Sequence, residues 1–163
     1  KNSGIRKMNY WYLGLGLLAG LMLPIQAGVN NNLGAVFGKQ PLVAAFLSFL
    51  IGTLVLGVAV LFKADLQAIP HGFASLVISD AWKWLGGAMG AFFVFTSIFL
   101  APKIGVANMV FMFILGQLMM AMVIDGLGLF GLPVQTLHWT KVVGLLAMLA
   151  SVAFFMMGKK WLN

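Results

Sequence analysis

The sequence contains no cysteine and no glutamate among its 163 residues. Without cysteine, disulfides and thiolate metal sites are excluded, and the redox compartment cannot be read. Only 3 residues are acidic, and charged residues of both signs make up 8% of the chain, against about 25% in a typical soluble domain. Because so few charges cannot cover a water-facing surface, the composition excludes a soluble globular fold.

Hydrophobic residues make up 62% of the chain, and 10 Lys and Arg residues give a formal charge of +7. In a soluble protein this excess of positive charge would suggest nucleic acid as a partner. Here the basic residues lie between hydrophobic runs, where the rule relating positive charge to membrane orientation places them. The composition therefore predicts an integral membrane protein whose first partner is the lipid bilayer, with no nucleic-acid partner.

Crossing the ~30 Å hydrocarbon core takes about 20 apolar residues in a helix. Five runs reach or approach this length, at about residues 10–37, 42–62, 84–101, 104–124 and 142–158. We therefore predict an all-α integral membrane protein, with a single five-helix transmembrane domain over residues 8–163. All five tryptophans lie at or beside the ends of these runs, as amphipathic rings at the headgroup level do: Trp11, Trp82, Trp84, Trp139 and Trp161.

Two segments outside the spans carry their own expectations. Residues 1–7 precede Met8, and "MNYWYLGLG" from Met8 reads like a natural start, so we expect residues 1–7 to be a leader or a cloning remnant. Between the second and third spans, apolar residues at helical spacing predict a short interfacial helix at about residues 69–79. A plain loop is the alternative.

Lysine and arginine are almost evenly divided between the two membrane faces. Counting residues 1–7, six lie on the face where the first span begins and four on the other; from Met8 the numbers are three and four. A chain without charge bias can insert both ways round, which permits an antiparallel pair. The alternative is one orientation, set by features other than charge.

The first span ends in "LPIQAGVNNNLG", which carries amides at membrane depth. Gln26 and Asn30 are four residues apart and share a helix face, with Pro24 and Gly28 around them. Pro24 removes a backbone hydrogen bond and frees the carbonyl of Gly20, which predicts a kink. Irregular helices at membrane depth are tolerated where they line a cavity. We expect both amides to line one; interhelical hydrogen bonds, worth about 0.6 kcal/mol each, are the alternative.

The fourth span holds a second amide, Gln117, close to the membrane midplane and directly after Gly116. We predict that Gln117 joins the substrate cavity, whereas Asn108, nine residues earlier, faces the opposite side. Asp125 ends this span without a neighbouring base. It is a possible ionisable site, with interface capping as the alternative.

Small residues at spacings of four suggest packing seams. Gly16 and Gly20 continue towards Pro24 in the first span, and Gly86 and Gly90 form G-x-x-x-G in the third. For catalysis there is no basis, because both histidines lie in the connections between spans, far apart in the chain and without a carboxylate or nucleophile arrangement. We predict no enzyme activity, no metal site and no cofactor.

Four motifs in order resemble a known family: "GLMLPIQAGVNNNLG", "PLVAAFLSFLIGTLVLG", "WKWLGGAMGAFFVFTSIFLAPKIGVA" and "ILGQLMMAMVIDGLGLFG". The chain from Met8 to Gly131 is similar to the short, five-span YdcZ-type branch of the drug/metabolite transporter superfamily, whose members are inner-membrane exporters. By position, the resemblance implicates Pro24, Gln26, Asn30, Trp84, Gly86, Gly87, Gly116, Gln117 and Asp125.

The resemblance implies a half-transporter. Full-length members of the superfamily have ten helices in two halves of opposite orientation, so two five-helix copies would pair antiparallel into an inverted-repeat assembly. It implies a bacterial inner-membrane, multi-pass secondary transporter that exports a small organic metabolite or drug-like solute by alternating access. The expected partner chain is a second copy or a related, oppositely oriented chain, and Trp84 is expected to stack on the solute or gate its path.

Two other functions remain open at this point. "GGAMGAFF" resembles a motif of dual-topology small-ion channels, but those have four spans, and the basic-aromatic pair expected after the glycines is absent. The other alternative is a non-transporting membrane helper or scaffold subunit, in which every polar side chain would be buried in fixed helix contacts.

Overall fold

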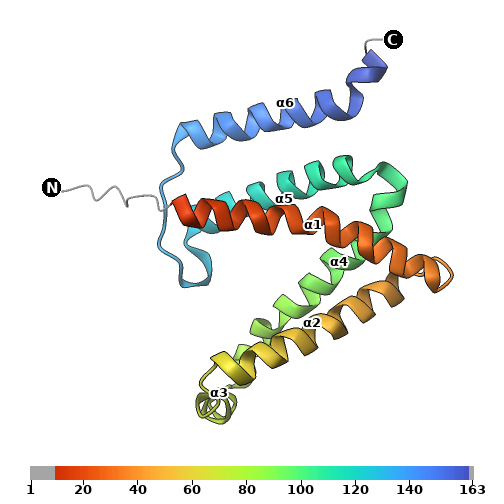
Figure 1. Cartoon of the computed structure of the whole chain (residues 1–163). Coiled ribbons are helices and arrows are strands. Elements are labelled where there is room, and N and C mark those ends of the chain that lie inside the picture. Colours follow the sequence, from red (N-terminus) through yellow and green to blue (C-terminus); the bar gives the residue numbers. More distant parts are fainter. Residues whose placement is uncertain (1–9, 162–163) are drawn as a thin grey trace. The chain divides into compact units, whose positions relative to one another are not determined.

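The computed structural model describes residues 10–161, and the regular structure in this range is helical. Five of the helices are long and apolar enough to cross a membrane. They are α1 (Tyr10–Val36), α2 (Pro41–Lys63), α4 (Leu85–Ile104), α5 (Val106–Leu127) and α6 (Trp139–Trp161), labelled in Figure 1. The prediction of an all-α membrane protein with five spans is confirmed, whereas the predicted leader, residues 1–7, lies outside the described residues.

Three short helices lie between the long ones: α3 (Ala68–Ser75), the 3-10 helix η1 (Ile78–Trp84) and a second 3-10 turn, η2 (Leu129–Gly131). The short helix predicted at about residues 69–79 is present as α3, but it ends at Ser75, because Leu76 and Val77 have extended backbone angles before η1 begins. The third span extends past its predicted end at residue 101, because α4 continues through Pro102 to Ile104. Gly105, at φ +83°, then separates α4 from α5.

The chain divides between Pro102 and Lys103 into two compact units. The first unit contains α1, α2, α3, η1 and most of α4. The second contains α5, η2 and α6.

In the first unit, α1 and α2 form a hairpin that turns within a few residues (Figure 1). Gly38 and Lys39 adopt left-handed backbone angles, with φ of 70° and 61°. The N–H of Gln40 donates to the carbonyl of Gly34 at 3.2 Å and closes the turn. Gly34 is buried in the last turn of α1, and a Cβ built on it would lie 3.4 Å from the Cβ of Ala44. The absence of a side chain at residue 34 lets the two helices approach.

The core of the first unit lies near this turn. Ala44 and Ala45 at the start of α2 pack with Val94 and Ile98 of α4, and Leu33 of α1 packs against the same cluster. Small alanine side chains on α2 leave room for the larger side chains of α4. Away from this cluster, most side chains of α1 and α2 are exposed, which suits contact with lipid or with another protein surface.

In the second unit, α5 and α6 pack antiparallel. The rings of Phe111 and Phe155 meet at a centroid distance of 4.5 Å near one end of the pair. At the other end, α5 stops at Gly128, which has the left-handed φ of 61°. A Cβ at this position would lie 2.7 Å from Cγ2 of Val134, so the connection to α6 folds tightly over a glycine that no other residue can easily replace.

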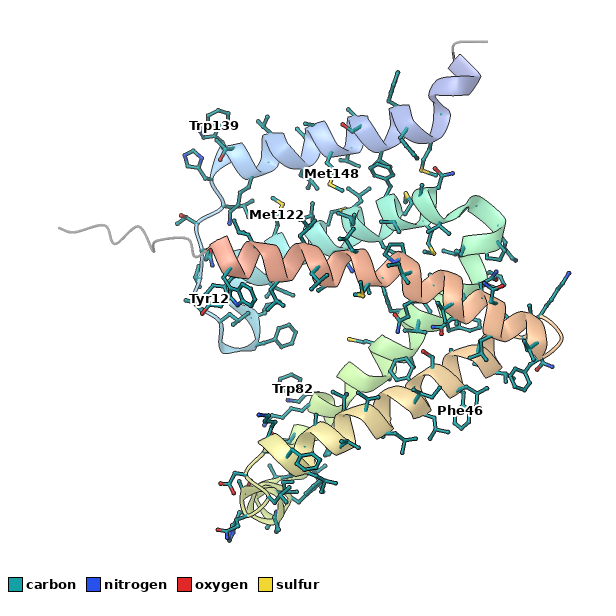
Figure 2. The ribbon with its side chains drawn as sticks, in the orientation of Figure 1. Tyr12, Phe46, Trp82, Met122, Trp139 and Met148 are labelled. Carbon is teal, nitrogen blue, oxygen red and sulfur yellow. The ribbon has the colours of Figure 1, made fainter. Side chains whose placement is uncertain are left out.

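Aromatic side chains at the helix ends are exposed, as an interfacial belt requires. Trp11 is 71% exposed and Trp139 is 66% exposed, each at the start of its helix. Figure 2 shows Tyr12, Trp82 and Trp139 at such ends. The side chain of Trp161, the fifth predicted member of the belt, lies outside the described ones.

Candidate functional site

Asn30 is the buried polar residue of α1, with 4% of its surface exposed. Together with Ala27 and Gly34 it forms a buried stripe, since residues three and seven apart lie on one helix face. Gln26, which the sequence places on the face of Asn30, is exposed at the margin of this stripe. The two predicted cavity residues therefore differ in environment, because four residues of helix overshoot a full turn by about 40°.

The amide nitrogen of Asn30 has no hydrogen-bond partner, and among the buried side chains that the structure describes it is alone in this. Four other polar side chains in the long helices do bond to backbone carbonyls. Those of Asn32, Ser97, Asn108 and Ser151 each donate to a carbonyl three or four residues earlier, at 2.7–3.2 Å. Leaving a buried donor unpaired costs about 1–3 kcal/mol. None of the described residues supplies an acceptor for the amide nitrogen of Asn30.

Pro24 lies within α1, which continues as one 27-residue helix across it. Proline has no N–H to donate to the carbonyl of Gly20, so that carbonyl loses its helix bond. A Cβ at Gly28 would meet no atom within 4 Å. Within two helical turns, the segment from Pro24 to Asn30 thus combines a missing backbone hydrogen bond, a glycine with unoccupied space beside it and an unpaired side-chain amide.

Trp84 lies at the start of the third span, where η1 passes into α4, and it is 61% exposed. Its ring stacks on Phe73 of α3 with centroids 6.1 Å apart. Along α4, fourteen residues separate Trp84 from the core residue Ile98, about 21 Å of helix rise. Trp84 therefore belongs to the end of α4 beside α3, not to the core cluster that Leu33 of α1 contacts.

Gln117 and Asp125 both lie on α5, in the second unit. Gln117 is exposed in the middle of the helix. The carboxylate of Asp125 lies 3.7 Å from the ammonium of Lys141 on α6, so the expectation that Asp125 has no neighbouring base is wrong. The base is sixteen residues away in the sequence, and the tight turn after α5 brings it back.

The glycines predicted to mark helix-packing contacts differ in how closely a neighbouring helix approaches them. A Cβ at Gly90 would lie 3.4 Å from the ring of Phe49, so α4 approaches α2 there. At Gly16, Gly20 and Gly86 a Cβ would meet nothing within 4 Å. Gly34, which sequence reasoning missed, lies equally close to a neighbouring helix, since its Cβ would be 3.4 Å from the Cβ of Ala44 on α2. Its position seven residues after Ala27, on the stripe of Asn30, is the signal that could have found it.

The five long apolar helices define a multi-pass membrane protein. Among the described residues, no group of three or more His, Asp or Glu side chains could hold a metal. The chain belongs to the family described as "Putative inner membrane exporter, YdcZ", which matches residues 11–154 and so includes most of every span. The resemblance and the inner-membrane location are confirmed. The family indicates an exporter rather than an enzyme. No curated protein and no solved structure matches the chain.

Proposed function

We propose that the chain is a half-transporter that exports a small organic solute across the bacterial inner membrane. Two copies, or this chain and a related one of opposite orientation, pair antiparallel and move the solute by alternating access. The family supports export, and the five-helix length supports a half-unit that needs a second half.

The observation that carries the proposal is the unpaired amide of Asn30. A buried donor without an acceptor is costly in a helix that crosses a membrane, because lipid tails offer no acceptor. An acceptor on the solute, such as a carbonyl or ether oxygen, would satisfy this donor during passage. Between passages water entering the cavity would take the same place. Asn30 is thus the solute's hydrogen-bond donor in α1.

Gln26 and Gln117 complete the polar contacts in this proposal. Both side chains are exposed, and an amide directed at lipid loses the hydrogen bonds it makes in water. The cavity of the assembled pair supplies water, solute or partner groups to both. Trp84, which stacks on Phe73 at the end of α4, gates one mouth of the path, and Pro24 with Gly28 lets α1 bend.

The assembly itself is supported by the exposed surface of the helices. Most of α1 and α2 is apolar and exposed, and Gly16, Gly20 and Gly86 leave open backbone where another helix can approach closely. The near-equal division of Lys and Arg between the membrane faces is compatible with both orientations.

The test compares the culture media of cells that produce the wild-type chain, the Asn30→Leu variant or neither. Membrane amounts of both proteins are matched by immunoblot. We expect at least one small organic solute to accumulate outside the wild-type cells and to return to the control level with Asn30→Leu. Identical media from wild-type and empty cells would count against export, and full export by Asn30→Leu would count against the assigned donor.

A further inference from the structure

A second feature of the molecule lies away from the amides of α1. In the second unit, a pocket of about 760 Å³ opens between α5, α6 and the segment that joins them. Its lining comes from the second half of α5 and from two leucines: Gly116, Met119, Met120, Met122, Val123, Gly126, Leu127, Leu137 and Leu145. We name it the α5–α6 pocket. Its volume is within the range of pockets that hold small ligands.

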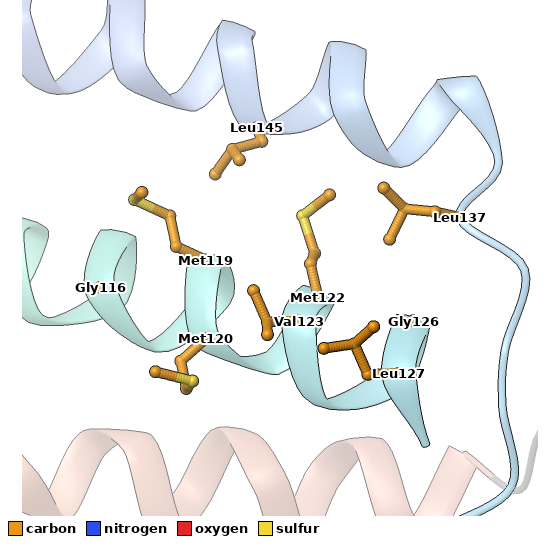
Figure 3. A pocket seen from close by; sticks show the side chains of 9 residues that line it. All are labelled: Gly116, Met119, Met120, Met122, Val123, Gly126, Leu127, Leu137 and Leu145. Carbon is orange, nitrogen blue, oxygen red and sulfur yellow. The ribbon is translucent and has the colours of Figure 1, made fainter. Parts of the chain in front are cut away.

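Every side chain of the lining is apolar. In Figure 3, Met119 and Met122 point from α5 towards α6, and Leu145 points from α6 back into the gap. Gln117, although next to Gly116 in the sequence, is not part of the lining. Methionine side chains are flexible and adapt to irregular partners. With no polar side chain to orient a ligand, the pocket suits a flexible hydrocarbon.

The pocket has the depth of one membrane leaflet. Gly116 is in the middle of α5, and Gly126 is one residue from its end. Ten residues of α-helix rise about 15 Å, which is half of the ~30 Å hydrocarbon core. An occupant that fills the pocket therefore extends from near the midplane to one face of the membrane.

A charged pair stands at the outer end of the pocket. Asp125 precedes the lining residue Gly126, and its carboxylate is 3.7 Å from the ammonium of Lys141. The side chain of Lys141 remains 40% exposed. Trp139, 66% exposed at the start of α6, lies at the same end. A lysine and a tryptophan at this depth are the groups that meet phospholipid headgroups.

We propose that the α5–α6 pocket binds one acyl chain of a phospholipid, with the lipid phosphate beside Lys141. The apolar lining, the length of one leaflet and the cation at the outer end all match this occupant. This site is independent of the proposed export path, because none of the amides assigned to that path lines it.

The test uses phosphatidylglycerol that carries a photoreactive diazirine at the end of one acyl chain. The full-length protein is reconstituted with this lipid, irradiated and digested, and the adducts are mapped by mass spectrometry. We expect labelling near residues 116–123 to exceed labelling of α2 near Leu54 and Leu61, whose exposed side chains report ordinary surrounding lipid. Equal labelling of α2 and the pocket would overturn the proposal.

Gly116→Leu provides the pocket-filling variant, since a Cβ at this position meets no atom within 4 Å. Gly144→Leu is the matched control: it places the same side chain on α6, also in open space and outside the pocket. We expect Gly116→Leu to lower labelling by about tenfold, the change expected from losing the burial of two methylene groups. Unchanged labelling with Gly116→Leu, or an equal loss with Gly144→Leu, contradicts the assignment.

A photoreactive amino acid at position 122 identifies the occupant without filling the pocket. Lipid adducts support the proposal. Cross-links to a second copy or to another part of the chain overturn it, because protein would then fill the space.

The headgroup assignment has its own test. Lys141→Gln should reduce labelling by the phosphatidylglycerol probe while leaving labelling by a diacylglycerol probe with the same acyl chains, which carries no phosphate, unchanged. Equal effects of the substitution on the two probes would overturn the assignment of the phosphate to Lys141.

Discussion

Asn30 and Gln26 show how strongly the surroundings decide what an amide in a membrane helix does. Both side chains have the same chemistry and lie one helical turn apart. One is buried without a partner and the other is exposed. A buried, unpaired donor persists only where something outside the chain satisfies it or where function maintains it. This contrast makes Asn30 the most informative residue to change.

Asn30→Leu removes the unpaired donor and keeps a side chain of similar size. We expect the variant to be as stable as the wild type or more stable, since the cost of about 1–3 kcal/mol for an unmet donor disappears. Export should be lost. Thermal unfolding in detergent measures the first effect and the culture-medium assay the second. A variant that is clearly destabilised would indicate that Asn30 makes a structural bond instead.

Gly34 allows a prediction about packing. Gly34→Leu adds a side chain whose Cβ alone would lie 3.4 Å from the Cβ of Ala44 and from the carbonyl oxygen of Gln40. We expect a loss of about 1–3 kcal/mol from overpacking, measured as a lower unfolding temperature. Gly57→Leu on α2 is the control, because a Cβ there meets nothing within 4 Å. Equal stability of the two variants would show that the hairpin does not need the small residue.

Among the secondary-structure elements, α1 combines the functional and the packing features. Its final two turns pack on α2, whereas its first half is exposed. Pro24 stands where the exposed part meets the buried stripe. An interruption in the backbone bonding at this place lets one half of α1 move while the other stays in the hairpin.

Pro24→Ala restores the backbone donor and removes this freedom. We expect the variant to unfold at a higher temperature, because proline is the least favourable residue inside a helix. Export should become slower while the amount of protein in the membrane stays the same. Faster or unchanged export in the more stable variant would argue against bending at Pro24 during transport.

The elements differ in how far sequence could predict them. The five spans follow from length and apolarity, and α3 follows from its helical spacing, because both signals are local. The Lys141–Asp125 pair could not be predicted, since it depends on how Gly128 and the residues after it turn the chain. The same holds for Asn30 and Gln26: their different burial comes from packing against other helices, which a periodic pattern does not specify.

For the molecule as a whole, orientation in the membrane is the decisive property. A chain whose basic residues are almost balanced between the faces has little reason to prefer one orientation. If both orientations occur, one sequence supplies both halves of an inverted-repeat transporter.

The orientation can be measured with two reporters, one active only in the cytoplasm and one active only in the periplasm. Each is fused in turn behind Asn163 on a chain that starts at Met8. We expect signal from both fusions. Adding two lysines next to Lys39 should shift the balance to one orientation and abolish export by the chain alone. Signal from a single reporter with the unchanged chain would mean a fixed orientation and would direct the search to a related partner chain.

The tight turn between α1 and α2 also matters while the protein is being made. Because Gln40 closes onto Gly34 within a few residues, the first two spans can pair as soon as both have left the ribosome, before the later helices exist. From Met8 onwards, the only basic residues flanking this hairpin at that moment are Lys39 in the turn and Lys63 at its end. If the chain starts at Met8 and inserts in both orientations, the insertion machinery would choose between them from these two lysines, and the proportion of the two orientations would be set early in synthesis.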